Sequence, residues 1–179
     1  MLLLVGLGNP GSNYSNTRHN IGFKIIDAIN SHFKLSKQKP KFKGLLTTGN
    51  IDEKKIYAIK PLTFMNNSGT AIKELIDYFK IDAKDVFVFH DDMDIDFGKI
   101  KAKFGGSSAG HNGIESIDKF IGKDYSRVRI GIGHPKQKKK VNNHVLEDFK
   151  EEEEDKINEI TDNIVKQLPT LIEKKIDLF

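Results

Sequence analysis

Two short, uninterrupted apolar runs constrain the fold of this chain more than any other feature of its sequence. The first, Leu2–Leu7, ends at the turn sequence Gly8-Asn9-Pro10-Gly11, and the second, Val86–Phe89, leads directly into His90-Asp91-Asp92. A strand with one face in water alternates apolar and polar residues, so unbroken apolarity predicts strands that are buried on both faces. Such strands need helices on either side of their sheet, which indicates an α/β protein.

Helical and strand-like periodicities alternate along the rest of the chain. Apolar residues recur at helical spacing in 21–33, 68–79 and 114–121, whereas 45–51, 55–59, 100–104 and 128–132 are predicted as strands. The residues around Pro40 are predicted as a loop, and Pro169 divides the C-terminal helical pattern into 151–166 and 170–175. The alternation predicts an α/β sandwich with a mixed sheet and a site at the carboxyl ends of its strands.

Length and composition limit the classes of protein to consider. With 179 residues, the chain is predicted to form one domain spanning 1–179. It contains no cysteine, which excludes disulfides, zinc–thiolate sites and a thiol nucleophile. No segment approaches the roughly 18 consecutive apolar residues of a membrane helix, and the apolar start of the chain is too short for a signal peptide. We therefore expect a cytoplasmic protein.

Charge is distributed unevenly along the chain. Residues 1–146 hold 24 lysines and arginines against 14 acidic residues, whereas residues 147–179 hold 5 against 11. The positive excess of the first part favours an anionic partner, with nucleic acid as the first candidate. The alternative is a solvated face without a partner, because 26 of the 29 basic residues are lysine, a common surface residue.

Two familiar motifs are present in incomplete form. Gly6-Leu7-Gly8-Asn9-Pro10-Gly11 matches the dinucleotide-binding pattern, but a polar stretch follows where that motif requires the start of a helix. Asp92-Met93-Asp94-Ile95-Asp96 resembles the start of a calcium loop, yet the positions of its glycine and its last acidic ligand hold phenylalanine and lysine. We reject both interpretations. A metal on His90 and Asp91 stays open, although no second histidine lies at ligand spacing.

A third motif supports a rival enzyme class. Gly106-Ser107-Ser108-Ala109-Gly110 matches the nucleophile elbow of serine esterases, with Ser108 as the nucleophile. That elbow lies directly between a buried strand and a helix, whereas here the preceding strand is predicted to be half-exposed and two glycines intervene. The simpler interpretation is a glycine- and serine-rich loop, and the esterase is kept as an alternative.

Polar side chains gather at the predicted strand ends and loop edges. They are Asn9, His19-Asn20, Met65-Asn66-Asn67, Asp91 and His111-Asn112. One histidine, one aspartate and several carboxamides suit hydrolysis by water. The histidine takes a proton from water, the aspartate holds the imidazole, and amide N–H groups stabilise the oxyanion. Each residue alone is more common as a surface or turn residue, so this chemistry requires that they meet in space.

Five sequence blocks occur in order along residues 4–149. They are Gly6–Gly11 with Tyr14 and Thr17–Gly22, then Pro61–Gly69, His90–Asp94, Gly110–Gly113 and Arg127–Gly133. Together they resemble bacterial peptidyl-tRNA hydrolases. The resemblance implies a single three-layer α/β/α globule with a twisted mixed β-sheet and C-terminal helices, in which 150–179 form an acidic helical lid. It implies a monomer without cofactor or metal that hydrolyses the ester bond of peptidyl-tRNA by water and without a covalent intermediate.

The resemblance also implies roles for individual residues. His19 matches the general base, Asp91 the aspartate that orients it, and Asn9 the asparagine that distinguishes N-blocked from free aminoacyl groups. The substrate-contacting positions match Tyr14, Phe64, Asn66 and Asn112, with Met65 in the peptide cleft and His111 at its border. The loop before His111 departs from some relatives, since Ser107 and Ser108 stand where those carry more glycine and a further histidine.

Contacts to tRNA phosphates are a hypothesis from charge and position. Lys101 and Lys103 alternate on strand 100–104 directly before the His111 loop, and Arg129 lies on strand 128–132. An enzyme that ignores peptide sequence takes its affinity from backbone contacts, so we expect these three residues to bind acceptor-stem phosphates. The role of the basic segment 136–140 stays open. A non-catalytic tRNA-binding module is the second alternative to a hydrolase.

Overall fold

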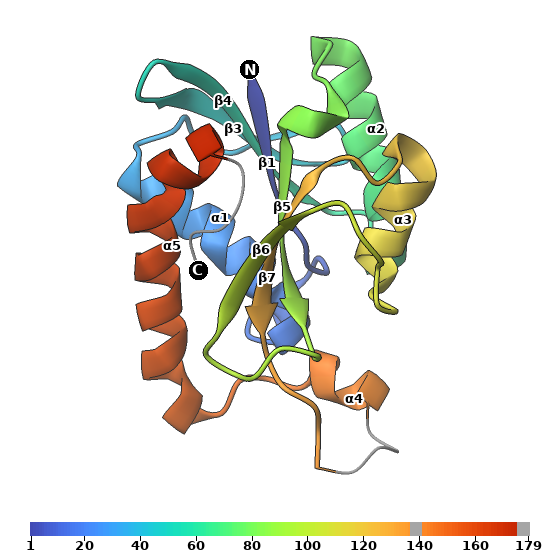
Figure 1. Ribbon diagram of the computed structural model, residues 1–179, viewed down its shortest axis with the longest axis vertical. Helices are drawn as coiled ribbons and strands as arrows, with labels where there is room; N and C mark the ends of the chain where they lie inside the picture. Colours follow the sequence, from blue (N-terminus) through green and yellow to red (C-terminus); the bar gives the residue numbers. More distant parts are fainter. Residues whose placement is uncertain (137–140, 175–179) are drawn as a thin grey trace.

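A seven-stranded mixed sheet forms the centre of the molecule, which we describe from a computed structural model covering residues 1–136 and 141–174 (Figure 1). The strand order is β2-β3-β4-β1-β5-β7-β6. The strands are β1 (Leu2–Gly6), β2 (Lys39–Lys41), β3 (Gly44–Ile51), β4 (Lys54–Pro61), β5 (Val86–Asp92), β6 (Ile100–Phe104) and β7 (Ser126–Gly131). The helices are α1 (Ile21–His32), α2 (Ser68–Phe79), α3 (Asn112–Ile121), α4 (Val141–Leu146) and α5 (Glu154–Lys174). Of the short 3-10 turns, four bear on the site: η1 (Ser12–Tyr14), η2 (Arg18–Asn20), η3 (Met65–Asn67) and η6 (Glu151–Glu153).

Four neighbouring strands in the middle of the sheet are parallel. β1 pairs in parallel with β4 and β5, and β5 pairs in parallel with β7, whereas β3 and β6 run antiparallel to their neighbours. The carboxyl ends of the parallel strands therefore lie at one edge, the lower edge in Figure 1. The predicted mixed sheet is confirmed, and so is the shared edge that the site requires.

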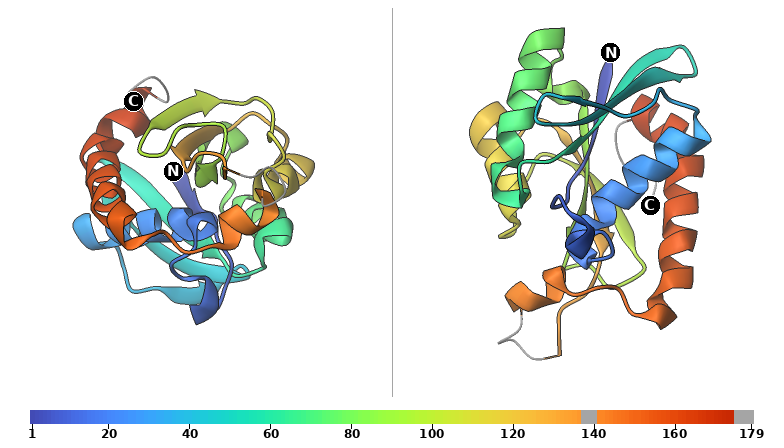
Figure 2. Two further views of the ribbon diagram at one scale, coloured as in Figure 1. Left: turned by 90° about the horizontal axis from the view of Figure 1, so that it is seen from below. Right: turned by 180° about the vertical axis from the view of Figure 1, so that it is seen from behind.

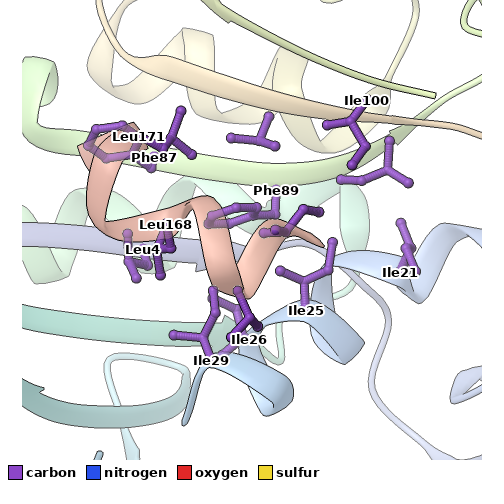
Figure 3. Close-up of a cluster of buried hydrophobic side chains, with 14 of the residues drawn as sticks. Leu4, Ile21, Ile25, Ile26, Ile29, Phe87, Phe89, Ile100, Leu168 and Leu171 are labelled. Atoms are coloured by element: carbon purple, nitrogen blue, oxygen red, sulfur yellow. The ribbon is translucent and has the colours of Figure 1, made fainter. Parts of the chain in front are cut away.

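Helices cover both faces of this sheet, as the apolar runs predict. α1 and α5 lie on one face and α2 and α3 on the other (Figures 1 and 2). Alternate residues of the same strand enter different layers: Leu4 packs in the cluster with α1 and α5, and Leu3 packs in the cluster with α2 and α3. Figure 3 shows the first cluster, where Phe87 and Phe89 of β5 meet Ile25 of α1 and Leu168 of α5.

Two glycines let α1 begin in direct contact with the sheet. A Cβ on Gly6 of β1 would lie 2.2 Å from the carbonyl oxygen of Gly22, and a Cβ on Gly22 would lie 2.5 Å from the carbonyl oxygen of Phe89. These separations are too short for any side chain, so only glycine permits this approach. The close packing brings the residues just before α1 to the end of β5.

The structure corrects two local predictions and adds one helix. α5 continues through Pro169, where the sequence predicted two helices. A proline removes one helical hydrogen bond, but Leu168 and Leu171 on either side of it are fully buried and hold the helix against the core. The segment around Pro40 is the edge strand β2 instead of a loop, a place in a sheet that tolerates proline. Helix α4 was not predicted.

The described part of the acidic segment 150–179 is mostly α5. Its apolar face is buried in the core through Ile157, Ile160, Ile164, Val165, Leu168, Leu171 and Ile172. The lid role expected for this segment stays a prediction. Within the described residues, no helix is long and apolar enough to span a membrane.

Candidate active site

A histidine–aspartate pair lies at the carboxyl edge of the sheet. His19 is in the 3-10 turn η2 immediately before α1, and Asp91 is near the end of β5. Nδ1 of His19 lies 2.9 Å and 2.8 Å from the two carboxylate oxygens of Asp91. An ionised carboxylate only accepts hydrogen bonds, so Nδ1 carries the proton and Nε2 of the neutral ring keeps a free lone pair. The structure thus brings together the two residues that the sequence proposed as base and orienting acid.

A second imidazole donates to the same carboxylate. Nδ1 of His111 accepts hydrogen bonds from the backbone N–H groups of Gly113 and Ile114 at 3.1 Å and 3.3 Å, and thereby caps α3. Because Nδ1 accepts, the proton of the neutral ring lies on Nε2, which is 2.9 Å from Oδ1 of Asp91. The sequence placed His111 only at the border of the cleft and gave no sign of this contact.

The environment of Asp91 keeps it ionised. Its side chain is buried, which alone would raise its pKa, but the electrostatic interaction with His19 and His111 and the hydrogen bonds from both rings lower the pKa below the ordinary value of 3.8. The carboxylate therefore stays negative at neutral pH. A fixed negative charge beside His19 stabilises the imidazolium that forms when Nε2 takes up a proton.

A third histidine lies next to this group and stays neutral. His90 is 4% exposed, and its Nδ1 donates to the backbone carbonyl of Asp91 at 2.8 Å. Its ring stands edge-on to the ring of His111, with the centroids 4.9 Å apart. Burial, and then the neighbouring His111, lower the pKa of His90 from 6.5 to about 3. A ring of this kind supports the backbone of Asp91 but carries no charge near pH 7.

The cluster resembles a metal site in composition but not in hydrogen bonding. In residues 1–136 and 141–174, ligand atoms of His19, Asp91 and His111 lie within 4.8 Å of one another. A metal on Nε2 of His111 would require a proton on Nδ1, which already accepts two backbone N–H groups. His90 is not one of these three residues, and its Nδ1 donates to a backbone carbonyl. These donors suit a hydrogen-bonded base better than a divalent cation.

Asn9 is held with a defined amide orientation beside this pair. The backbone N–H of Met65 donates to Oδ1 of Asn9 at 2.8 Å. A backbone N–H can only donate, so the contacted atom is the oxygen, and the two N–H groups of Nδ2 point elsewhere. Within the described part of the chain, Nδ2 has no hydrogen-bond partner. Asn9 can therefore offer two donors to a ligand.

Phe64 precedes Met65 in a strained conformation. Its φ of 61° and ψ of 156° belong to a region that is almost restricted to glycine, and its side chain is 53% exposed. Tyr14 on η1 and Asn66 on η3 lie in the neighbouring segments. Neither has a hydrogen bond to His19 or Asp91 among the residues the structure describes. Phe64 is thus exposed next to Met65, whose N–H contacts Asn9, and the substrate contacts of Tyr14, Phe64 and Asn66 stay predictions.

A pocket opens between the end of β5, the loop before α3, and α4. It has a cavity volume of about 90 Å³, and its lining includes His19, Asp91, His111, Asn112 and Ser108. The hydroxyl of Ser108 makes no hydrogen bond to a histidine in the described residues. The preceding residues Gly105 and Gly106 separate it from β6, so the context of a nucleophile elbow is absent here.

Arg127 fixes the loop that carries His111, a role that the sequence did not reveal. Its side chain is 1% exposed and donates to the Ser107 carbonyl at 2.8 Å and to Asp118 of α3 at 2.9 Å. The hydroxyl of Tyr125 donates to the same Asp118 oxygen at 2.7 Å, and burial raises the pKa of Tyr125. An arginine inside an otherwise buried strand is the signal that could have found it.

The proposed phosphate-binding residues share one face of the sheet. Lys101 pairs with Arg129 across β6 and β7, and residues that are directly opposite point to the same side. Lys103 lies two residues further along and crosses Gly106 of the loop, since a Cβ there would lie 2.1 Å from its Cε. Partial burial and the nearby Arg129 lower the pKa of Lys103. Arg129 also approaches Asp92 at 3.5 Å. Of the basic segment 136–140, residues 137–140 lie outside the described residues.

Comparisons with known proteins agree over the whole length of the chain. A family model described as peptidyl-tRNA hydrolase matches residues 3–178. The curated peptidyl-tRNA hydrolase of Pelagibacter ubique (strain HTCC1062) is 72% identical over 100% of this chain and 96% of that protein. That of Bartonella quintana (strain Toulouse) is 46% identical over 100% and 93%. A crystal structure of peptidyl-tRNA hydrolase from Acinetobacter baumannii has a TM-score of 0.92 at 35% identity, covering 98% of this chain and 90% of that one.

Proposed function

The chain belongs to the peptidyl-tRNA hydrolase family and hydrolyses peptidyl-tRNA, and we propose that His19 is the general base of this reaction. The hydrogen bond between Nδ1 of His19 and Asp91 carries the proposal. It fixes the tautomer and leaves Nε2 as the atom that takes a proton from water. The aspartate then stabilises the imidazolium while the new bond forms.

The proposed reaction proceeds in two steps, the addition of water and the cleavage of the ester bond. Water adds its oxygen to the ester carbonyl carbon and gives one proton to Nε2 of His19. The carbon–oxygen bond to the terminal ribose then breaks, and the ribose oxygen takes that proton, which regenerates the neutral base. Asn112, which lines the same pocket, offers amide N–H groups to the developing oxyanion. No covalent intermediate is needed.

Specificity for the N-blocked aminoacyl group is assigned to Asn9. With Oδ1 engaged by Met65, Asn9 presents only donors, and a peptide carbonyl is the complementary acceptor. The ammonium of a free aminoacyl group is itself a hydrogen-bond donor and would face the N–H donors of Asn9, so the free aminoacyl group binds less well. We propose that Tyr14, Phe64, Met65 and Asn66 contact the substrate beside it.

The tRNA body is proposed to lie along the basic face of β6 and β7. Lys101, Lys103 and Arg129 point to the same side of the sheet, in the strands adjoining the His111 loop. Their charges would bind acceptor-stem phosphates without reading the base sequence. We further propose a single domain that acts as a monomer in the cytoplasm, where tRNA is used, with 150–179 acting as its lid.

The serine esterase alternative can be tested separately from the histidine mechanism. The unaltered protein and Ser108→Ala are compared on N-acetyl-aminoacyl-tRNA, with release of the acyl group as the readout. We expect equal rates, because the Ser108 hydroxyl has no histidine partner in the described residues. Loss of activity in Ser108→Ala would instead support the esterase, and no cleavage by either protein would leave a binding module.

A further inference from the structure

We propose that Asn20 is a positioning residue that sets the discrimination between N-blocked and free aminoacyl groups by fixing Asn9. The inference rests on the recognition role proposed above for Asn9. Asn20 itself is 1% exposed and therefore has no direct access to substrate. Its influence has to pass through the residue that it holds.

The side-chain amide of Asn20 pairs with both backbone groups of Asn9. Oδ1 of Asn20 accepts from the backbone N–H of Asn9 at 2.9 Å, and Nδ2 of Asn20 donates to the backbone carbonyl of Asn9 at 2.9 Å. This is the two-bond pattern that a neighbouring strand would provide. Asn9 lies in the Gly8–Gly11 turn beyond β1, where no strand continues, so Asn20 supplies the missing partner.

The side chain of Asn9 is held from a different direction. Its Oδ1 accepts from the N–H of Met65, which lies 56 residues further along the chain. The backbone and the side-chain oxygen of Asn9 are thus anchored by three hydrogen bonds between 2.8 Å and 2.9 Å. The Nδ2 donors have one fixed direction as a result. Loss of the Asn20 pair would free the turn and let that direction vary.

Asn20 also fixes Asn9 relative to the base. It follows His19 directly in η2, so η2 and the Asn9 backbone form one hydrogen-bonded unit. The hydroxyl of Thr17 supports this unit, since it donates to the Tyr14 carbonyl at 2.9 Å and lies 3.4 Å from Oδ1 of Asn20. The group that recognises the acyl carbonyl and the base that activates water are therefore held at a fixed position relative to each other.

The test uses Asn20→Ser in the full-length chain. Serine is neutral and too short to bond both backbone groups of Asn9, so it adds no charge that would attract an ammonium. The readout is the ratio of kcat/KM for N-acetyl-aminoacyl-tRNA to kcat/KM for the same tRNA with a free aminoacyl group. We expect this ratio to fall by about tenfold to a hundredfold, because small misplacements of a positioning group have effects of that size.

A matched control is Asn30→Ser on α1. Oδ1 of Asn30 accepts from Thr47 at 2.7 Å, so the variant loses a side-chain hydrogen bond away from the site. We expect it to lower thermal stability without changing the ratio. A fall in the ratio for Asn30→Ser equal to that for Asn20→Ser would overturn the inference, because general destabilisation would then explain both.

Two further variants keep the outcomes distinct. Asn9→Ala tests the proposed recognition role: if it leaves the ratio unchanged, that role fails and the inference fails with it. If Asn9→Ala lowers the ratio and folded Asn20→Ser does not, only the role of Asn20 is contradicted. If Asn20→Ser does not fold, Thr17→Val is used instead. It removes the hydroxyl that contacts Oδ1 of Asn20 but keeps Asn20 itself, so it should lower the ratio by a smaller factor. An unchanged ratio in Thr17→Val would then count against the proposal.

Discussion

Nε2 of His111 lies 2.9 Å from Oδ1 of Asp91. The carboxylate that holds the proposed base is therefore held in turn by an imidazole whose other nitrogen caps α3. The cap and the contact with Asp91 can be separated by mutation, because asparagine is a good helix N-cap but is too short to replace both functions.

We predict that His111→Ala and His111→Asn lose similar activity but differ in stability. Both variants remove the donor to Asp91, so kcat should fall by about tenfold in each. His111→Ala also leaves α3 uncapped, which costs about 1 kcal/mol, whereas His111→Asn keeps an acceptor for the first N–H groups. Steady-state kinetics and urea unfolding check the two effects. Full activity in the asparagine variant would show that the bond to Asp91 is not used.

His90 should make the stability of the protein depend on pH. Its pKa in the folded protein is about 3, below the 6.5 of an ordinary histidine, so the unfolded chain binds the additional proton first. Stability is then fully present above pH 6.5 and is lost as the pH falls from 6.5 towards 3. Between these values the free energy of unfolding should fall by up to about 1.4 kcal/mol per pH unit more than in His90→Asn. Equal slopes in urea unfolding at pH 6.5, 5.5 and 4.5 would refute this assignment.

The strain at Phe64 predicts a gain of stability at the expense of binding. The backbone conformation of Phe64 costs about 1–3 kcal/mol for any residue type other than glycine. Phe64→Gly therefore relieves this strain, and it also removes the exposed ring. Phe64→Ala removes the same ring but keeps the strain. We therefore expect both variants to raise KM, and only the glycine variant to raise the melting temperature. An unchanged KM in both would mean that the ring does not contact substrate.

Lys103 is predicted to contact a tRNA phosphate. Its replacement by alanine should reduce the slope of log K against log salt concentration by about one, the effect of losing a single phosphate contact. Lys73→Ala is the matched control, because Lys73 lies on α2 and is paired with Asp77 at 2.8 Å. We expect no change of slope in the control. An unaltered slope in Lys103→Ala would show that Lys103 makes no phosphate contact.

The sequence predicted the layers of this fold but not all of its contacts. The unbroken apolarity of Leu2–Leu7 and Val86–Phe89 was enough to predict a sheet covered on both faces, and the polar residues after these strands indicated the candidate site. The predicted helix break at Pro169 was wrong. Local propensity opposes a helix at a proline, but burial of the residues around Pro169 favours one. That contribution depends on tertiary packing, which the local pattern does not contain.

The candidate site shows the same division. The pairing of His19 with Asp91 could be predicted, because the resemblance covers both residues. The structure brings the two side chains within hydrogen-bond distance. The donor role of His111 and the loop contact of Arg127 were missed, since each depends on which atom of a side chain faces a partner distant in sequence. Residue type and spacing do not determine such orientations. For His19 the orientation depends on the close approach of α1 to the sheet, which Gly6 and Gly22 permit.

The most direct test of the account is the activity of His19→Ala on N-acetyl-aminoacyl-tRNA, measured together with its affinity for tRNA. Removal of the general base should lower kcat by about 10²- to 10⁴-fold. Affinity for tRNA should stay close to that of the unaltered protein, because the proposed phosphate contacts lie on β6 and β7. A folded His19→Ala variant that binds tRNA and hydrolyses the substrate at the unaltered rate would contradict the account.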